Sequence, residues 1–552
     1  MTQGIIKNKI YIPEEDTTEE CLRDGYEIEI FNESVCARCP YKKDKPNEYC
    51  QACGAYEGIL RLWSKVTVKG KNYYTIPAGN IKRAKEVTGI DFSIYKDLRC
   101  RMPFSNPLKW TGKLREGEIV NDVKSANQKE IVDKWLGKKR YGFIQAPPRT
   151  GKTVIANCIS MSLGVKTLII AHQNELLVNF MDSLKRDTNL LELQKQTGKE
   201  IAKIMESKKD LEKEDYDILL FTYQSFIREA SEEDIKKYLK GHYGLIIVDE
   251  AHQAGATAYA KFLGKLDARY RLGMSATPLR KDALNFVLLN LIGPTTVKSE
   301  STGLIPRIEI VETGIKSKYK YSLFVKAYQF LQKSEARNKL LLKEVIKDLN
   351  EGHNCIIIPV DSKAHMNALV SSINGFYKDE IALGYWRGVE NRKGILKEID
   401  AGKYKVIVAI KSMIKQGIDL KVPTMLYLQI GMSAEPQPKG CPMFYQMSNR
   451  VCTPFTGKRE PVVKIFVDEL PQSYGCFRSL FTKEIKPGLA TPVDGKPKYK
   501  MSQKAFDYAT SIVKRIGMKN YSQSGKYNPD KDLEKPKETP AAHFDLFTGS
   551  WL

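Results

Sequence analysis

The sequence has no apolar run long enough to cross a lipid bilayer. Its longest apolar stretches, such as residues 167–171 and 355–358, have the length of a strand, whereas a membrane-spanning helix needs about 20 residues. Residues 1–9 also lack the apolar core of a secretory signal peptide. We therefore expect a soluble intracellular protein that does not use a membrane as a partner.

Acidic residues are scarce relative to basic ones. The chain has 65 Asp and Glu against 88 Lys and Arg, which gives a net charge of +23 at pH 7. This excess favours a polyanionic partner, because each lysine or arginine that faces a phosphate releases condensed counterions. Nucleic acid is the expected partner, and the alternative is that the charge serves solubility alone.

Cysteine is present as 11 residues, an odd number, and most stand singly in apolar runs, as Cys158 and Cys355 do. Cytosolic cysteines of that kind are usually small buried hydrophobic residues.

Four cysteines near the N-terminus are arranged differently. They form two Cys-x-x-Cys pairs, Cys36 with Cys39 and Cys50 with Cys53. Two such pairs present four thiolates for tetrahedral coordination, which selects Zn²⁺, and with no fifth ligand nearby the site is expected to be structural. A redox pair or a chance arrangement is the alternative. Basic residues interleaved with tyrosines in the intervening loop suit a nucleic-acid backbone. These basic residues are Lys42, Lys43 and Lys45.

The length of the chain, 552 residues, predicts roughly two to four domains. From about residue 119, strand-length apolar runs alternate with helical patterns, which predicts an α/β fold with parallel sheets and helices on both faces. Earlier, residues 66–76 predict a hairpin that turns at Gly70. The expected divisions are 1–55 (lead-in and zinc knuckle), 56–118 (β-rich accessory unit, expected to bind nucleic acid), 119–297 (first α/β region), 298–482 (second α/β region) and 483–552 (basic extension and tail).

The stretch from residue 141 to residue 156 predicts a strand, a Pro-rich loop and a helix over 154–163. Backbone N–H groups in such a loop and at the helix N-terminus bind phosphate. Lys152 is predicted to reach the β and γ phosphates of ATP, and the Thr153 hydroxyl to ligate Mg²⁺. Ala146 stands where the usual pattern has its first glycine. The loop residues expected to contact ATP are Pro148, Arg149, Thr150, Gly151, Lys152 and Thr153.

A second apolar strand, over residues 245–248, ends in Asp249 and Glu250. Asp249 is predicted to hold Mg²⁺, and Glu250 to orient and deprotonate the attacking water. His252 is predicted to couple the state of the nucleotide to neighbouring loops. Gln128, on an expected helix ahead of the phosphate loop, is predicted to contact the adenine edge, with an ordinary surface glutamine as the alternative.

Two further buried strands, over residues 167–171 and 218–221, also end in polar residues. Ligands bind at the carboxyl ends of strands in open α/β sheets. The resulting candidate nucleic-acid contacts are His172, Thr222, Tyr223, Gln224 and Ser225.

Taken in this order, these segments resemble the superfamily 2 helicases of the DEAH-box kind. The matching segments are residues 146–153, 167–177, 221–225, 249–252 and 275–277, and the resemblance extends over residues 119–470. Residues 274–282 and the region around 74–77 are most similar to the double-strand-tracking branch, which includes phage branch-migration helicases of the UvsW type. The resemblance implies an ATP-dependent helicase or translocase that acts on duplex or branched DNA, mainly through its backbone, in a bacterial or phage-infected cytoplasm.

The resemblance also implies two RecA-like lobes with ATP bound between them. Strands of the second lobe are expected at 354–360, 381–388 and 404–410. Gly417 and Asp419 match the element that links the nucleotide and nucleic-acid sites. Gln446 and Arg450 match the element that brings an arginine to the γ-phosphate.

The sequence departs from the family in that last element. Asn449 and Thr453 stand where the family has a glycine and a second arginine, and an arginine finger raises the hydrolysis rate by about 10³-fold or more. Lys458 or Arg459 is a candidate substitute. Three other hypotheses follow: an RNA-dependent helicase, a nucleotide-switched DNA-binding protein with slow turnover, and a restriction-system motor, which the lack of a nuclease carboxylate–lysine cluster in the sequence disfavours. The apolar end of the tail, residues 544–552, is a candidate peptide for a protein partner.

Overall fold

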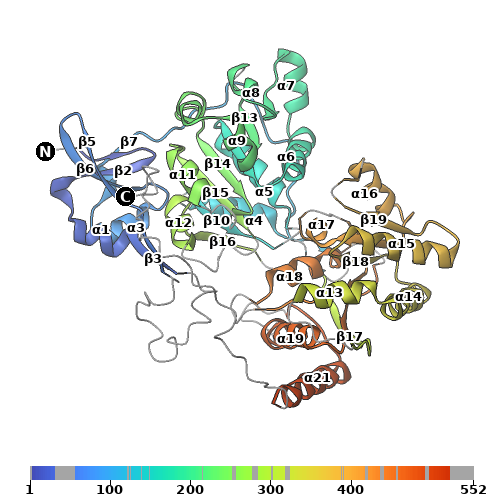
Figure 1. Ribbon diagram of the computed structural model, residues 1–552. Helices are drawn as coiled ribbons and strands as arrows, with labels where there is room; N and C mark the ends of the chain where they lie inside the picture. Colours follow the sequence, from blue (N-terminus) through green and yellow to red (C-terminus); the bar gives the residue numbers. More distant parts are fainter. Residues whose placement is uncertain are drawn as a thin grey trace. The chain divides into compact units, whose positions relative to one another are not determined.

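Two large parallel β-sheets carry most of the described chain (Figure 1). The structure, a computed structural model, describes residues 3–31, 56–120, 123–124, 126–138, 140–147, 150–213, 215–251, 257–275, 284–299, 303–317, 324–386, 388–389, 391–416, 420–434, 440–454, 458–490 and 497–521. Its contacts divide the chain into two units. Unit 1 holds the described residues up to Gly117 and those from Ala126 to Ser301, and unit 2 holds Glu118–Ser125 and those from Thr302 onward.

The sheet of unit 1 has seven parallel strands in the order β12-β13-β11-β14-β15-β10-β16. Its central strands are mainly apolar because both faces of the sheet are covered. Along β11, Leu168 and Ile170 pack into one core, while Ile169 and Ala171 pack into another. The strands are β10 (Tyr141–Gln145), β11 (Thr167–Ala171), β12 (Ala202–Ile204), β13 (Ile218–Thr222), β14 (Leu245–Asp249), β15 (Tyr270–Ser275) and β16 (Thr295–Lys298).

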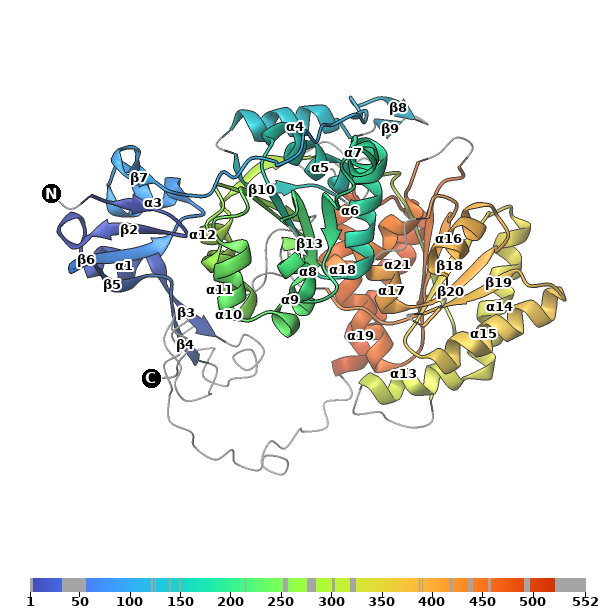
Figure 2. The ribbon, with the colours of Figure 1, turned by 90° about the horizontal axis from the view of Figure 1, so that it is seen from above.

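Helices cover both faces of this sheet (Figure 2). One face is covered by α4 (Gln128–Gly137), α5 (Lys152–Leu163), α6 (Asn174–Asp187) and α7 (Leu190–Thr197). The other face is covered by α9 (Tyr223–Glu229), α11 (Thr257–Lys265) and α12 (Leu284–Leu291). The short α8 (Lys209–Lys213) and α10 (Glu232–Asp234) complete the unit.

A smaller five-stranded sheet, in the order β5-β6-β2-β1-β7, forms the N-terminal part of unit 1. The predicted hairpin is confirmed, since β5 and β6 pair around Lys69 and Gly70, both with positive φ. The lead-in expected within residues 1–55 differs from that expectation in two ways. It contains a helix, which begins after the capping residue Thr18 and buries Leu22 and Tyr26. Its strands at residues 5–6 and 9–13 share one sheet with residues 64–77, so a division at residue 55 cuts through that sheet. The elements are β1 (Ile5–Ile6), β2 (Lys9–Pro13), α1 (Glu19–Tyr26), β5 (Ser64–Val68), β6 (Lys71–Pro77), α3 (Ile81–Thr88) and β7 (Lys96–Asp97).

Unit 2 contains a six-stranded parallel sheet in the order β17-β22-β21-β18-β20-β19. With the first sheet it confirms the expected α/β fold with two parallel-sheet lobes. The strands are β17 (Arg307–Glu312), β18 (Ile356–Val360), β19 (Ala382–Tyr385), β20 (Val406–Ile410), β21 (Met425–Leu428) and β22 (Val462–Val467). One face is covered by α14 (Glu335–Asn350) and α15 (Lys363–Tyr377). The other is covered by α13 (Phe324–Lys333), α16 (Arg392–Asp400), α17 (Lys411–Gln416), α18 (Pro442–Ser448), α19 (Pro471–Leu480) and α21 (Gln503–Tyr521).

The region after residue 483 was expected to be an extension, and its first part instead belongs to the core of unit 2. Ala509 and Ile512 of α21 are fully buried in that core, and the Ile308 N–H donates to the Lys500 carbonyl at 2.8 Å. The amphipathic pattern of α21 therefore covers the sheet beside β17. Within the described ranges, no helix is both long and apolar enough to span a membrane.

Candidate nucleotide site

The strand tips singled out in the sequence lie along one edge of the unit 1 sheet. Because the strands are parallel, their carboxyl ends meet at the same edge. Neighbouring tips are paired in register: Ala171 with Thr222, Asp249 with Met274, and Gln145 with Ser275. The β10–α5 loop, the acidic pair after β14 and the polar ends of β11 and β13 are therefore brought together by topology.

The β10–α5 loop begins at Ala146 and ends where α5 starts. Ala146 is fully buried, and its N–H donates to the Ser275 carbonyl at 3.1 Å. The left-handed conformation of the loop falls on Gly151, with φ +82°, which caps α5. A Cβ on Gly151 would lie 2.1 Å from Nε2 of Gln128. Glycine is thus required at this position, both by the backbone conformation and by the close approach of a side chain.

The side chain of Gln128 is buried and braces this loop. Its Nε2 donates to the Thr150 carbonyl at 3.0 Å, and its Oε1 accepts from the Arg115 N–H at 3.0 Å. The Arg115 guanidinium donates to the same carbonyl at 2.8 Å. The surface-glutamine alternative is therefore wrong. Arg115 was missed in the sequence because nothing in its local pattern marks it as a partner of a loop 35 residues later.

Lys152, the first residue of α5, faces the acidic end of β14. Its Nζ lies 2.9 Å from Oε1 of Glu250, and both side chains are mostly shielded from solvent. Glu250 has a positive φ of 46°, which turns the chain directly after the strand. Its N–H donates to Oδ1 of the buried Asp249 at 3.0 Å. An ammonium group, two carboxylates and the helix N-terminus together form a place suited to the phosphates of a nucleotide and a divalent cation.

The residues at the end of β13 are partly buried in the core rather than exposed. The Thr222 hydroxyl accepts from the Ser225 N–H at 3.1 Å and caps α9. Tyr223, expected to contact nucleic acid, is buried and stacks on Tyr259, with ring centroids 4.3 Å apart. Burial, and to a smaller degree Asp249, raises the pKa of the Tyr259 hydroxyl well above its usual range. Gln224 and the partly exposed His172 remain accessible at this edge.

In unit 2, the predicted element around Arg450 holds the segment that follows β20. Arg450 Nε donates to the Ile414 carbonyl at 2.9 Å. The Thr453 hydroxyl donates to the Leu420 carbonyl at 3.1 Å, and Lys458 Nζ to the Lys421 carbonyl at 2.9 Å. Thr453, which stands where the family has its second arginine, thus anchors this segment. Gln446 lies in α18, half-buried.

Several residues predicted for these sites lie outside the described residues. They are Cys36, Cys39, Lys42, Lys43, Cys50, Cys53, Pro148, Arg149, His252, Gly417 and Asp419.

Comparison with known proteins gives one family model and a set of helicase relatives. The model described as "Type III restriction enzyme, res subunit" matches residues 123–280. A protein named helicase 22 of Sulfolobus islandicus filamentous virus is 23% identical over 411 residues, which is 68% of each chain. A DNA 3′–5′ translocase of Sulfurisphaera tokodaii is 23% identical over 351 residues, 56% of this chain and 75% of its own. A protein named helicase D10 of Escherichia phage T5 is 25% identical over 333 residues, 58% of this chain and 66% of its own.

The family model covers the β10–α5 loop and the acidic end of β14, and the relatives extend over more than half of the chain. The two parallel-sheet units agree with the RecA-like architecture of superfamily 2 helicases. These similarities indicate a nucleic-acid-dependent ATPase of the helicase kind.

Proposed function

We propose that the protein is a DNA translocase or helicase that acts on duplex or branched DNA, as the branch-migration helicases of the UvsW type do. The observation that carries the proposal is the Lys152–Glu250 pair at 2.9 Å, on the sheet edge where the β10–α5 loop ends. The relative named as a DNA 3′–5′ translocase supports DNA as the substrate.

In this proposal, Lys152 binds the β and γ phosphates of ATP, and Glu250 orients the attacking water and accepts its proton. Asp249 and the Thr153 hydroxyl offer oxygen ligands, the kind that Mg²⁺ prefers, and both lie at the expected edge. A bound Mg²⁺ would neutralise charge on the phosphates. The Gln128 amide donates to the loop backbone. Its effect on adenine binding would therefore be indirect, through the position of that loop.

We extend the proposal to unit 2. Arg450 is the arginine expected to act on the γ-phosphate, and Gln446, Gly417 and Asp419 are expected to belong to the same nucleotide-sensing elements. The three hydrogen bonds that tie residues 450–458 to residues 414–421 support the view that these two segments move together. Loss of the γ-phosphate would then change both segments at once.

A panel of labelled substrates tests the choice of nucleic acid. We expect ATP-dependent branch migration or strand separation on DNA forks and four-way junctions, and slower processing of an RNA fork of the same sequence. Faster processing of RNA would favour an RNA-dependent helicase. ATP-dependent retention on DNA without strand separation would favour a nucleotide-switched DNA-binding protein.

The zinc knuckle remains part of the proposal on the spacing of Cys36, Cys39, Cys50 and Cys53. The ends of the segment that contains them are held together, because β3 (Glu27–Phe31) and β4 (Tyr56–Arg61) pair antiparallel with Phe31 opposite Tyr56. Metal analysis of the purified protein should find one zinc per chain, lost in a Cys36→Ser/Cys39→Ser variant and kept in a Cys158→Ser control. Absence of zinc from the parent protein would contradict the proposed zinc knuckle.

A further inference from the structure

A second charged site lies at the opposite edge of the unit 1 sheet from the β10–α5 loop. It is a cavity of about 490 Å³ between the small N-terminal sheet and the segment that leads into the large one. We call it the amino-edge cavity. Its charged lining includes Lys82, Lys85, Asp97, Arg99, Arg101 and Arg269.

The cavity is built on a rigid connection. The segment after β7 runs along the start of the large sheet, where Cys100 forms a bridge with Ala268. The Cys100 N–H donates to the Asp267 carbonyl at 2.7 Å, and the Lys166 N–H donates to the Met102 carbonyl at 2.8 Å. Arg99 and Arg101 flank Cys100 in this extended segment, so their side chains leave on the same side.

Three guanidinium groups converge on one carboxylate in this cavity. Asp97 accepts from Arg99 at 2.8 Å, lies 3.8 Å from Arg101 and also pairs with Arg269. The side chain of Arg99 is only 8% exposed. Burial and the neighbouring charge of Arg101 lower the pKa of Arg99 to about 10.

The positive charge exceeds the negative charge that faces it. Lys82 and Lys85 extend the basic surface from α3, and Lys85 has Asp91 at 3.8 Å. Arginine forks match phosphate oxygens in pairs, and lysines at an open rim add further charge. An additional anion would therefore relieve the repulsion among these groups, and a phosphate offers the right geometry.

We propose that the amino-edge cavity binds phosphates of the nucleic-acid backbone, as a second contact separate from the nucleotide site. Arg269 stands directly before β15 and the β10–α5 loop directly after β10, so the length of a five-residue strand, about 17 Å, separates the two edges. The inference rests on the proposed function for the identity of the polyanion. A nucleic-acid strand bound there would contact both the small sheet and the large one. The small sheet would then be part of the nucleic-acid-binding surface.

The test uses the full-length protein and a fluorescein-labelled DNA duplex, with binding followed by anisotropy at several salt concentrations. The variant is Lys85→Gln/Arg101→Gln, because both side chains are exposed and their loss leaves the Arg99–Asp97 pair in place. We expect duplex affinity to fall about tenfold or more, and the salt dependence to lose about one ion per phosphate contact. The matched control is Lys195→Gln/Lys199→Gln, which removes two exposed charges from and beside α7 and should bind as the parent does.

Equal affinity and an equal salt slope in the variant and the control would overturn the proposal, as would absence of duplex binding by the parent protein. Failure of the proposed function shows separately, as an absence of ATP hydrolysis on any nucleic acid. If the variant unfolds at the same temperature as the parent protein, the loss of binding is not caused by a loss of fold.

Discussion

Replacement of Lys152 by alanine should lower the nucleic-acid-stimulated rate of ATP hydrolysis by about 10²–10³-fold, the usual cost of one well-placed electrostatic contact to a reacting group. Lys152 begins α5 and lies 2.9 Å from Glu250, so its charge is placed where a helix N-terminus already favours phosphate. Duplex binding without nucleotide should be retained. Lys195→Ala, an exposed lysine of α7 in the same unit, is the control and should hydrolyse ATP at the rate of the parent.

A pair of glycine variants tests the same loop without removing a charge. Gly151→Ala would place a Cβ 2.1 Å from Nε2 of Gln128, whereas Gly164→Ala, at the other end of α5, meets nothing within 4 Å. Both glycines have positive φ, so each substitution carries a similar strain of about 1–2 kcal/mol. Only Gly151→Ala should lose affinity for a fluorescent ATP analogue. Hydrolysis by Lys152→Ala at the rate of the parent, or equal nucleotide affinity in the two glycine variants, would contradict the site.

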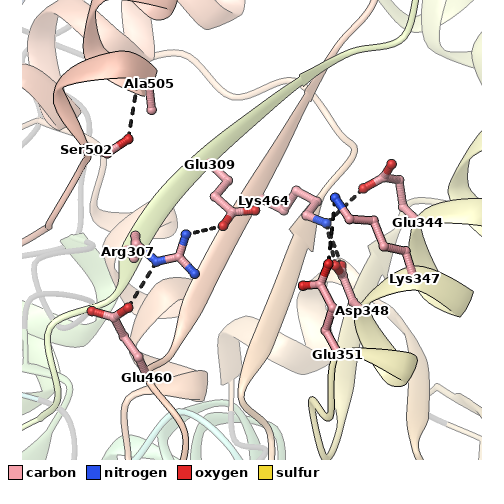
Figure 3. A network of polar contacts seen from close by, with 10 residues as sticks. All are labelled: Arg307, Glu309, Glu344, Lys347, Asp348, Glu351, Glu460, Lys464, Ser502 and Ala505. Carbon is pink, nitrogen blue, oxygen red and sulfur yellow. Dashed lines mark hydrogen bonds and ion pairs between the residues drawn. The ribbon is translucent and has the colours of Figure 1, made fainter.

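Replacement of Lys464 by methionine should destabilise unit 2 by about 3–5 kcal/mol, because removing one member of a buried ion pair leaves the other uncompensated. Lys464 lies in the middle of β22, and its Nζ contacts both Asp348 oxygens at 2.6 and 2.7 Å and Glu344 at 2.8 Å (Figure 3). Lys464 and Asp348 are each only 2% exposed. The Tyr427 hydroxyl also donates to Asp348.

The pH dependence of this pair follows from the direction of one pKa shift. Burial alone would lower the pKa of Lys464, but the hydrogen bonds to Asp348 and Glu344 outweigh it and raise that pKa above its ordinary value. The folded state therefore holds this proton more tightly than the unfolded state, so the stabilisation is present at neutral pH and is lost only as the pH rises through the folded-state pKa.

Chemical denaturation followed by circular dichroism measures the effect. The control is Lys347→Met on the exposed face of α14, where the nearest carboxylate, Glu351, is 3.9 Å away, and where a change within about 0.5 kcal/mol is expected. Lys464→Met/Asp348→Leu/Tyr427→Phe should recover part of the stability, because it removes the buried Asp348 charge together with the hydroxyl that donates to it, while the Glu344 side chain, 16% exposed, still reaches solvent. Lys464→Met with the stability of Lys347→Met would show that the pair does not hold β22 to α14.

The apolar strands and their polar ends were predictable because parallel strands buried on both faces are apolar throughout and end at one edge. For this reason the sequence alone predicts that Asp249, Glu250 and the residues around Lys152 lie near one another. What the local pattern does not encode is the partner of a buried polar group. Lys464, in an otherwise apolar strand, contacts carboxylates that lie 116 and 120 residues away. Tyr223 stacks on Tyr259, and no local pattern links these two residues.

Long-range convergence also explains the amino-edge cavity. Arg99 and Arg101 lie in the segment expected as a β-rich unit, and Arg269 lies far along the chain. The bridge between Cys100 and Ala268 and the hydrogen bonds beside it bring them to one carboxylate. In unit 2, the role of Thr453 was likewise not predictable from the sequence. Its hydroxyl donates to the Leu420 carbonyl, whereas a comparison of motifs with the family shows only that an arginine is missing at this position.

The most direct measurement is the rate of ATP hydrolysis by the purified parent protein, with and without duplex DNA, forked DNA and RNA. We expect slow hydrolysis by the protein alone and a marked increase with nucleic acid, greatest with duplex or forked DNA. Hydrolysis that no nucleic acid stimulates, or no hydrolysis at all, would contradict the conclusion that this chain is a nucleic-acid-driven motor.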